Sequence, residues 1–450
     1  MHFVFNYNLD DNIFKNEKKY FFTFLSDRFF SVNNNISNIL KGYEPIYILS
    51  EKPSRQFDLK NYIIFKYKNK KDNKNVIYDV INAYFSNNEF INDLVGGLYK
   101  KQGKIPLISF MSQQLTLNGK IKNKIKLICP DNKISDFLDN KVNQIKIFNK
   151  LKISIPETKI YKNFNSILKN INNIKFPVFI SSFTTKGGEG NAIIYNKKEL
   201  EIFYKKIKDK DSKKGKFFIA KYIENVVISP ASHAIILGKN KVQVVNISDQ
   251  ILNGIKYEGN IHPSKASHEN QEKIKETMIK LGKYFSKLGF RGLFGCDFII
   301  DKNGNLYISE VNPRRMAHYL MILLMSKKID LLDIELSVFL GKKIPEFTYD
   351  DLQCDFAWSN KKIKSDTGFA ITKKEIKKNT EETPFNNIGS EFYCTYFEKG
   401  KLLNSHIFGY YITTGTDYDE VLERTQKRTK TLKKQLIEEV DINDLKKKKK

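Results

Sequence analysis

The stretch Arg291–Arg314, RGLFGCDFIIDKNGNLYISEVNPR, predicts a β-hairpin. Two apolar runs, Leu293–Ile300 and Leu306–Val311, flank Asp301–Gly304, whose residues favour turns.

Three polar side chains stand out on the hairpin. Side chains alternate between the two faces of a strand, so Glu310 and Asn312 point the same way and Asp297 can lie nearly opposite Glu310. Carboxylates in an apolar hairpin are costly to bury unless a cation neutralises them, and such oxygen ligands suit Mg²⁺ or Mn²⁺. From spacing alone, a strand edge whose acids face water fits equally well.

Asp297, the turn DKNG and the string YISEVNPR resemble the metal-binding hairpin of the ATP-grasp superfamily of carboxylate ligases. This resemblance implies that Asp297, Glu310 and Asn312 are metal ligands. It also implies that Arg314 is the catalytic cation, close to the substrate or the transferred phosphoryl group.

The composition limits the class of protein. A chain of 450 residues fits several domains, and a net charge of +27 would ordinarily indicate nucleic acid or an anionic membrane. Lysine is abundant throughout the chain, and the closing run Lys446–Lys450 has the composition of a solvated tail. We therefore expect no nucleic-acid partner.

Two further features predict a soluble, cytoplasmic protein. The longest apolar run, Tyr319–Met325, is much shorter than the roughly 20 residues that span a bilayer. The four cysteines form no CxxC motif, so reduced thiols are expected.

Residues 1–137 alternate short β-like runs with helical ones, which predicts an α/β domain with a mostly parallel sheet. A helical pattern covers Val76–Tyr99, and no phosphate-binding glycine motif is present. A second helical pattern, Ile134–Leu151, then leads to Pro156 and marks a domain junction.

The string DNKVNQIKIFNKLKISIPET resembles the linker helix that enters ATP-grasp domains. Its early lysine, here Lys141, would reach an ATP phosphate. Without the resemblance, Lys141 would be interpreted as a lysine on a solvated helix face.

Phe176–Asn191, FPVFISSFTTKGGEGN, predicts a strand that leads into a glycine loop. Glycine allows the backbone to approach phosphates closely, and successive N–H groups can cradle an anion. The layout resembles the ATP-grasp flap, although the position of the usual second phosphate-binding lysine is Ser181. We predict that Lys186 replaces that lysine. The nucleotide-binding candidates in this loop are Lys186, Gly187, Gly188 and Gly190.

Phe217–Glu224, FFIAKYIE, predicts a strand that ends in a polar step. In the family this segment is the hinge between two subdomains, which implies that the backbone groups of Lys221 and Ile223 pair with adenine. Members of the family usually carry an acidic residue that pairs with the adenine amino group, and in this chain that position is Ala220. A plain buried strand is the alternative.

Between the hinge and the hairpin, Asp249–Pro263 has the glycine pattern of a loop and resembles the acceptor-side loop of these ligases. The isolated histidines His233 and His262 are expected to be surface or packing residues. Ser267 can cap a helix that ends at Leu288 and packs on the hairpin. The apolar stripe of that helix is Ile274, Met278, Leu281, Phe285 and Leu288.

After Arg314, the run Tyr319–Phe339 is helical in pattern. Ser390–Phe397 and Leu402–Thr413 predict a hairpin, followed by a helix from Asp417 to about Val440. This last part resembles the small C-terminal sandwich of the biotin-carboxylase-like branch of the superfamily.

We therefore predict a multidomain chain of α/β and α+β class. It has an N-terminal α/β pre-ATP-grasp domain at 1–137, a two-subdomain ATP-grasp fold at 138–345, a small β-rich C-terminal domain at 346–440 and a basic tail at 441–450. The ATP-grasp subdomains are expected at 138–228, which carries the nucleotide flap, and at 229–345, which carries the metal site.

The predicted function is that of an ATP-dependent ligase with Mg²⁺ or Mn²⁺. It would activate a carboxylate as an acyl-phosphate, join it to an amine of an amino acid or peptide, and release ADP and phosphate. One alternative is activation of bicarbonate as in biotin carboxylase, although Arg315–His318 stands where that branch has Gln-Val-Glu-His. The other is a non-catalytic nucleotide-binding module. A homodimer is compatible with this function.

Overall fold

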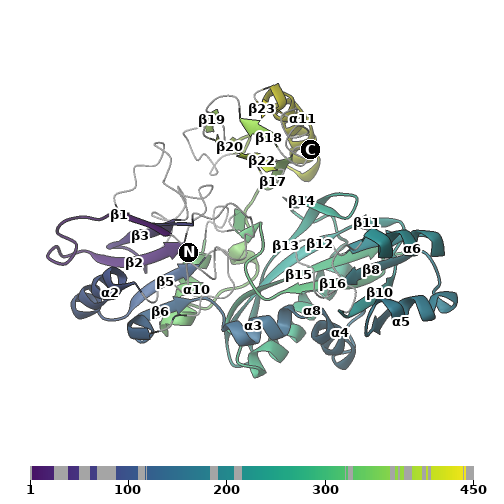
Figure 1. The fold of residues 1–450 in the computed structure, drawn as a ribbon, viewed down its shortest axis with the longest axis horizontal. Coiled ribbons are helices and arrows are strands. Elements are labelled where there is room, and N and C mark those ends of the chain that lie inside the picture. The colour runs from purple at the N-terminus through teal and green to yellow at the C-terminus, as the bar shows by residue number, and fades with distance from the viewer. Residues whose placement is uncertain are drawn as a thin grey trace.

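The computed structural model describes residues 3–24, 39–49, 61–67, 88–109, 117, 119–182, 191–206, 215–319, 321–322, 328–364, 370–372, 376–379, 388–397, 402–403, 407–438 and 440–441. Figure 1 shows an N-terminal α/β unit at one end of the long axis and the sheet that contains β8 and β10 at the other. Every helix in these ranges is too short or too polar to cross a membrane.

The N-terminal unit is built on a six-stranded sheet of order β1-β4-β3-β2-β5-β6. All neighbours in it are parallel except β1 and β4, which confirms the predicted mostly parallel sheet. Its strands are β1 (Phe3–Asn8), β2 (Lys19–Phe24), β3 (Tyr43–Leu49), β4 (Tyr62–Tyr67), β5 (Ile105–Ser109) and β6 (Ile125–Ile128).

Two predicted helices have different bounds in the structure. Helix α2 (Glu89–Gln102) begins after Asn88, whose extended backbone and side-chain cap prevent a continuous helix over Val76–Tyr99. Residues 76–87 of that prediction lie outside the described ranges. The predicted helix Ile134–Leu151 is two helices, α3 (Asn132–Asp139) and α4 (Lys141–Lys150), because Asn140 is extended and caps the N–H groups of the second.

A four-stranded antiparallel sheet of order β7-β10-β8-β9 follows α4. It consists of β7 (Thr158–Tyr161), β10 (Phe217–Lys221), β8 (Val178–Ser182) and β9 (Asn191–Ile194). Helices α5 (Phe164–Lys169) and α6 (Lys197–Lys206) supply Phe164, Ile167 and Leu200 to its core.

The largest sheet has ten strands. Its order is β11-β15-β12-β13-β14-β17-β22-β20-β19, and β16 pairs with β15. The strands are β11 (Val226–Ile228), β12 (Pro230–Gly238), β13 (Lys241–Asn253), β14 (Lys256–His262), β15 (Gly292–Asp301), β16 (Leu306–Asn312), β17 (Ala357–Lys364), β19 (Ile376–Asn379), β20 (Glu391–Phe397) and β22 (Ile407–Gly415). The expected loop Asp249–Pro263 is therefore mostly hairpin, since only Gly254 and Ile255 connect β13 to β14.

Helices cover both faces of this sheet. Helix α8 (His268–Lys287) packs on one face and is capped by Ser267, as predicted. Leu288 is the exception in its predicted apolar stripe, because it lies beyond the helix and is 37% exposed. On the other face lies α10 (Leu331–Leu340), which starts after the cap residue Asp330. Tyr319, Met321 and Ile322 are helical, as predicted, but residues 328–330 are not, so the predicted helix Tyr319–Phe339 is interrupted before α10.

The C-terminal strands continue the same sheet, because β17 pairs with β14 and β22 pairs with β17. The predicted pairing of Glu391–Phe397 with the final strand is present. Leu402–Leu403, however, forms a separate strand, β21, that pairs with β18 (Ala370–Thr372). A third strand, β23 (Val440–Asp441), completes that small sheet.

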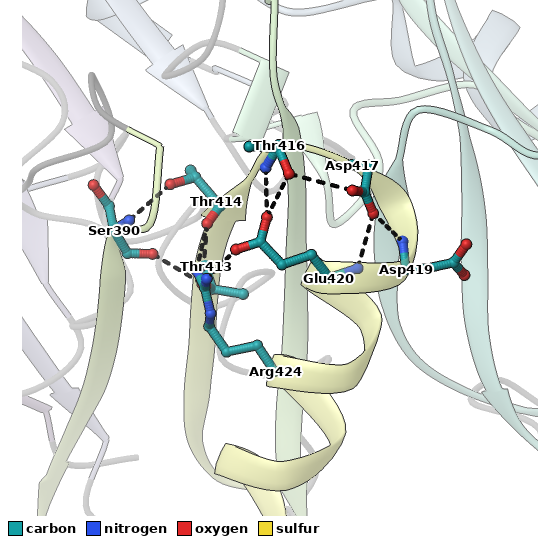
Figure 2. Close-up of polar contacts among 8 residues, drawn as sticks. All are labelled: Ser390, Thr413, Thr414, Thr416, Asp417, Asp419, Glu420 and Arg424. Carbon is teal, nitrogen blue, oxygen red and sulfur yellow. Dashed lines mark hydrogen bonds and ion pairs between the residues drawn. The ribbon is translucent and has the colours of Figure 1, made fainter.

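Helix α11 (Tyr418–Glu438) is fixed where it leaves β22 (Figure 2). Asp417 accepts a hydrogen bond from the backbone N–H of Glu420, which caps the helix. The Glu420 carboxylate accepts from Thr416 and pairs with Arg424, which donates in turn to the Thr414 carbonyl at 2.7 Å. The predicted helix from Asp417 therefore begins one residue later, with Asp417 as its cap.

Candidate functional site

The β15–β16 hairpin brings the predicted metal ligands together. Asp297 pairs directly with Glu310 and Gly295 pairs with Asn312, so all three polar side chains lie on one face. The Asn312 amide donates to the Asp297 carboxylate at 3.0 Å. The predicted register of the hairpin is confirmed.

The two carboxylates affect each other. Burial and the nearby Glu310 charge raise the pKa of Asp297 to about 7, although hydrogen bonding from Asn312 and the charge of Arg314 oppose the shift. Gln250 donates a further hydrogen bond to Asp297 at 2.7 Å. Ionised Asp297 and Glu310 therefore need more positive charge than the neighbouring side chains supply.

This donor set fits Mg²⁺ or Mn²⁺ held together with phosphates. Within the described ranges, no group of three or more His, Cys, Asp or Glu side chains forms a complete protein cage for a metal. Magnesium is commonly bound by one or two carboxylates while phosphates and water fill its other positions. Asp297, Glu310 and the Asn312 amide oxygen match that pattern.

Arg314 lies beside these ligands. Its guanidinium donates to the Asn312 side-chain oxygen at 2.9 Å, and its backbone N–H donates to the Asn312 carbonyl at 2.7 Å. A fixed positive charge is thus held next to the acidic pair.

Helix α4 places Lys141 beside the acidic pair Asp297 and Glu310. Three residues further along the helix, Gln144 donates to the Val311 carbonyl at 2.8 Å and accepts from the Val311 N–H at 3.0 Å. These two bonds fix α4 to β16. The Lys141 ammonium lies 3.9 Å from Glu310 and 3.5 Å from the Ser181 hydroxyl, so its surroundings are not those of a solvated helix face.

A pocket of about 420 Å³ separates the four-stranded sheet from the hairpin. This volume lies within the range of small-molecule sites, roughly 300 to 1,000 Å³. Asp297, Glu310 and Lys141 line its polar part, while Ile155, Phe179, Phe218, Ile299 and Ile308 contribute to its apolar part.

The hinge residues Lys221 and Ile223 also line this pocket. The Lys221 N–H donates to the Glu157 carbonyl at 2.8 Å, so a contact from Lys221 to a ligand would use its carbonyl group. Ala220 is a small, buried residue that lines the pocket.

The predicted flap residues Lys186, Gly187, Gly188 and Gly190 lie in 183–190, outside the described ranges. The ends of the loop are described. Ser181 pairs with Asn191 across β8 and β9 and donates to its side chain at 2.6 Å. Asn191, the first described residue after this segment, lines the pocket.

His233 and His262 are packing residues, as expected. The ring of His233 accepts from the Met316 N–H at 3.0 Å, and Nδ1 of His262 lies 3.0 Å from the Ile247 carbonyl. Burial lowers the pKa of His233 to about 3 and that of His262 to about 4. Both rings are neutral at physiological pH.

Sequence reasoning missed Gln250, Gln144 and Tyr257. Gln250 binds Asp297, and Tyr257 lines the pocket with its hydroxyl donating to Asn260 at 2.5 Å. The spacing of Gln144 from Lys141 on one helix could have indicated that the two act together. No local pattern distinguishes Gln250 or Tyr257.

Comparison with protein families identifies residues 138–318 as an ATP-grasp domain. The large chain of carbamoyl phosphate synthase from Clostridium botulinum (strain Langeland) is 27% identical over 208 residues, which are 45% of this chain and 18% of that protein. The corresponding protein of Clostridium beijerinckii is 25% identical over 254 residues, 55% of this chain and 22% of that protein. This chain therefore spans about a fifth of the length of these relatives.

Solved structures resemble nearly the whole chain. One is the biotin carboxylase domain dimer of Hydrogenobacter thermophilus 2-oxoglutarate carboxylase, in complex with MgADP, ADP and bicarbonate. Its TM-score is 0.64 at 16% identity, over 91% of this chain and 89% of that one. N5-carboxyaminoimidazole ribonucleotide synthetase from Thermotoga maritima has a TM-score of 0.57 at 15% identity, over 92% and 98%. The predicted fold class is confirmed.

Proposed function

We propose, from the premise that residues 138–318 form an ATP-grasp domain, that this chain is an ADP-forming ligase that joins a carboxylate to an amine. One observation carries the proposal. The acidic pair Asp297 and Glu310 and the helix lysine Lys141 line one pocket that separates two sheets. The guanidinium of Arg314 lies beside this pair, where it donates to Asn312.

The chemistry requires activation because a carboxylate does not react with an amine at neutral pH. A carboxylate oxygen attacks the γ-phosphorus of ATP, ADP leaves, and an acyl-phosphate remains. The amine nitrogen then attacks the acyl carbon, phosphate leaves, and the nitrogen loses a proton. Both steps depend mainly on positioning and on neutralising charge.

Each residue has a part in this scheme. Asp297, Glu310 and Asn312 would hold Mg²⁺, which neutralises phosphate charge when bound. Lys141 would contact a nucleotide phosphate, and the backbones of Lys221 and Ile223 would bind the adenine edge. The Arg314 guanidinium would stabilise charge on the transferred phosphoryl group and then on the tetrahedral oxyanion.

The flap completes the proposed site. We assign phosphate contacts to the backbone of Gly187, Gly188 and Gly190, with Lys186 in place of the lysine that is absent at Ser181. The domain bounds of the sequence analysis, 1–137, 138–345 and 346–440, are retained as part of the proposal.

The carboxylate is proposed to be an amino acid or peptide, and the amine likewise. The runner-up is activation of bicarbonate. It is supported by the similarity in fold to the biotin carboxylase domain whose structure contains bicarbonate. A non-catalytic nucleotide-binding module is the alternative from another class. A cytoplasmic location and a homodimer are also proposed, the first supported by the free thiols of Cys129 and Cys296.

A screen of ADP release tests the proposal. The purified protein is incubated with MgATP, a panel of amino acids, short peptides and bicarbonate as carboxylates, and amino acids and ammonia as amines. Release that needs both a carboxylate and an amine supports ligation. Release with bicarbonate alone supports the runner-up, and ATP binding with no turnover on the panel supports the binding module.

A further inference from the structure

Arg314 is followed at once by a buried charged residue. The Arg315 guanidinium meets the Glu335 carboxylate of helix α10 at 2.8 Å through Nη2, and Nε lies 3.1 Å from each carboxylate oxygen. The two side chains are only 4% and 2% exposed. This is a two-point contact between a planar cation and a carboxylate in the interior.

Tyr319 completes the arrangement. Its hydroxyl donates to Glu335 at 2.7 Å, and the Arg315 guanidinium lies 5.0 Å from the centre of its ring. Glu335 thus binds both ends of the segment from Arg315 to Tyr319.

The sheet holds the same segment from the other side. The Met316 N–H donates to the His233 ring at 3.0 Å. The Met316 side chain lies over Gly295 on β15, where a Cβ atom would come within 2.4 Å of it. Arg314 therefore projects from a backbone that is anchored both to β12–β15 and to α10.

Helix α10 is itself a fixed support. Asp333, two residues before Glu335, accepts a hydrogen bond from the Ile39 N–H of the N-terminal unit at 2.9 Å. Leu331, Leu332, Ile334 and Leu336 are buried in a core shared with Phe21, Ile108 and Ile128 of that unit. Helix α10, and Glu335 with it, is therefore held in place both by the ten-stranded sheet and by the N-terminal unit.

A buried ion pair is weak evidence for stability, because apolar residues of similar volume often serve as well. Because Arg315 directly follows Arg314 in the chain, the Arg315–Glu335 pair can also position the Arg314 side chain. We propose that Glu335 is a positioning residue, which acts through Arg315 to direct the Arg314 guanidinium at the transferred phosphoryl group. This inference rests on the proposed function and adds to it a residue far from Arg314 in the sequence.

The experiment uses ligands that need no knowledge of the natural substrates. Binding of MgADP alone reports on the nucleotide pocket, and MgADP with aluminium fluoride mimics a phosphoryl group in transfer. In Glu335→Gln we expect MgADP to bind nearly as in the wild type. Binding of MgADP with aluminium fluoride should weaken about tenfold or more, a loss typical of small misplacements of a catalytic group.

A double variant separates positioning from stability. Arg315→Met with Glu335→Leu replaces the pair by apolar side chains, so the unfolding temperature should stay near that of the wild type. The weakened binding of MgADP with aluminium fluoride should persist. If Glu335→Gln does not fold, the double variant alone decides the question.

The matched control is Glu420→Gln, which removes the carboxylate partner of Arg424 at the start of α11, outside the pocket (Figure 2). It should leave both affinities unchanged. Recovery of aluminium fluoride binding in the stable double variant, or wild-type binding in Glu335→Gln, overturns the positioning role. A wild-type protein that binds MgADP but gains nothing from aluminium fluoride overturns the proposed function itself, and the positioning role with it.

Discussion

Asp297 and Glu310 are direct cross-strand partners on the β15–β16 hairpin. Two carboxylates placed this close repel each other when both are ionised, and burial adds to the cost for Asp297. Such a pair is unfavourable in the protein by itself and favourable once a divalent cation is bound. This relationship underlies the first two predictions.

Glu310→Gln keeps the shape of the side chain and removes its charge. We expect turnover to fall by about 100-fold or more, because metal-assisted charge neutralisation contributes several kcal/mol to such reactions. The unfolding temperature of the metal-free variant should stay the same or rise, since a repulsion is removed. Steady-state kinetics over a range of Mg²⁺ and a thermal melt measure both effects. Near-normal turnover with an unchanged Mg²⁺ dependence would show that Glu310 is not a ligand.

The raised pKa of Asp297 predicts a pH dependence of stability. The native pKa of about 7 exceeds the ordinary value of 3.8, so the folded protein binds a proton that the unfolded chain releases. Stability without metal should therefore fall as the pH rises from about 4 to about 7, by up to about 4 kcal/mol, because each unit of pKa shift corresponds to about 1.4 kcal/mol. Above about pH 7 the ionised carboxylate is ready for Mg²⁺.

Denaturant unfolding at several pH values tests this, with and without Mg²⁺. Asp297→Asn should lose this contribution to the pH dependence and should be the more stable protein in the absence of metal near pH 8. Mg²⁺ should stabilise the wild type more near pH 8 than near pH 5. An equal pH slope in both proteins would contradict the assignment.

Substitution of Lys141 is predicted to weaken nucleotide binding. Its ammonium lies near Glu310 and Ser181, where a phosphate oxygen could replace weak protein contacts. Lys141→Met should raise the KM for ATP by about tenfold or more, the loss of one charge-assisted contact to phosphate. Lys146→Met, on the exposed side of the same helix, is the control. Equal effects of the two substitutions would remove Lys141 from the site.

Lys186 is predicted to replace the lysine that is absent at Ser181. Lys186→Met should raise the KM for ATP or slow phosphoryl transfer, because its flexible stem can bring the ammonium to the phosphates. Lys197→Met and Lys198→Met should do neither, as both lie beyond the flap at the start of α6. Similar behaviour of all three variants would rule the replacement out.

The local sequence pattern was sufficient to predict the β15–β16 hairpin and helix α8. The apolar runs on either side of DKNG predict the hairpin, and a β-bulge between Asp297 and Phe298 then shifts the register so that Asp297 lies opposite Glu310. Ser267 caps α8, and the buried stripe Ile274, Met278, Leu281 and Phe285 follows the helical period. In these segments local preference and tertiary packing agree.

Prediction failed where tertiary context decides. Asn140 is compatible with a helix interior, yet it caps α4, and Gln144 then fixes that helix to β16. The glycines of Asp249–Pro263 indicate a loop, but pairing with neighbouring strands makes most of it β-structure. Gln250 and Glu335 reach Asp297 and Arg315 from distant parts of the chain, and no sequence period marks such contacts.

Identification of the nucleotide product tests the central claim most directly. A reaction mixture of the wild-type protein, MgATP and the carboxylate and amine combination that gives the fastest turnover is resolved by nucleotide chromatography, with phosphate measured in parallel. The account predicts ADP and phosphate in equal amounts, because the hairpin would hold metal at the β- and γ-phosphates. AMP and pyrophosphate as the main products would mean that the carboxylate is adenylated, and would contradict it.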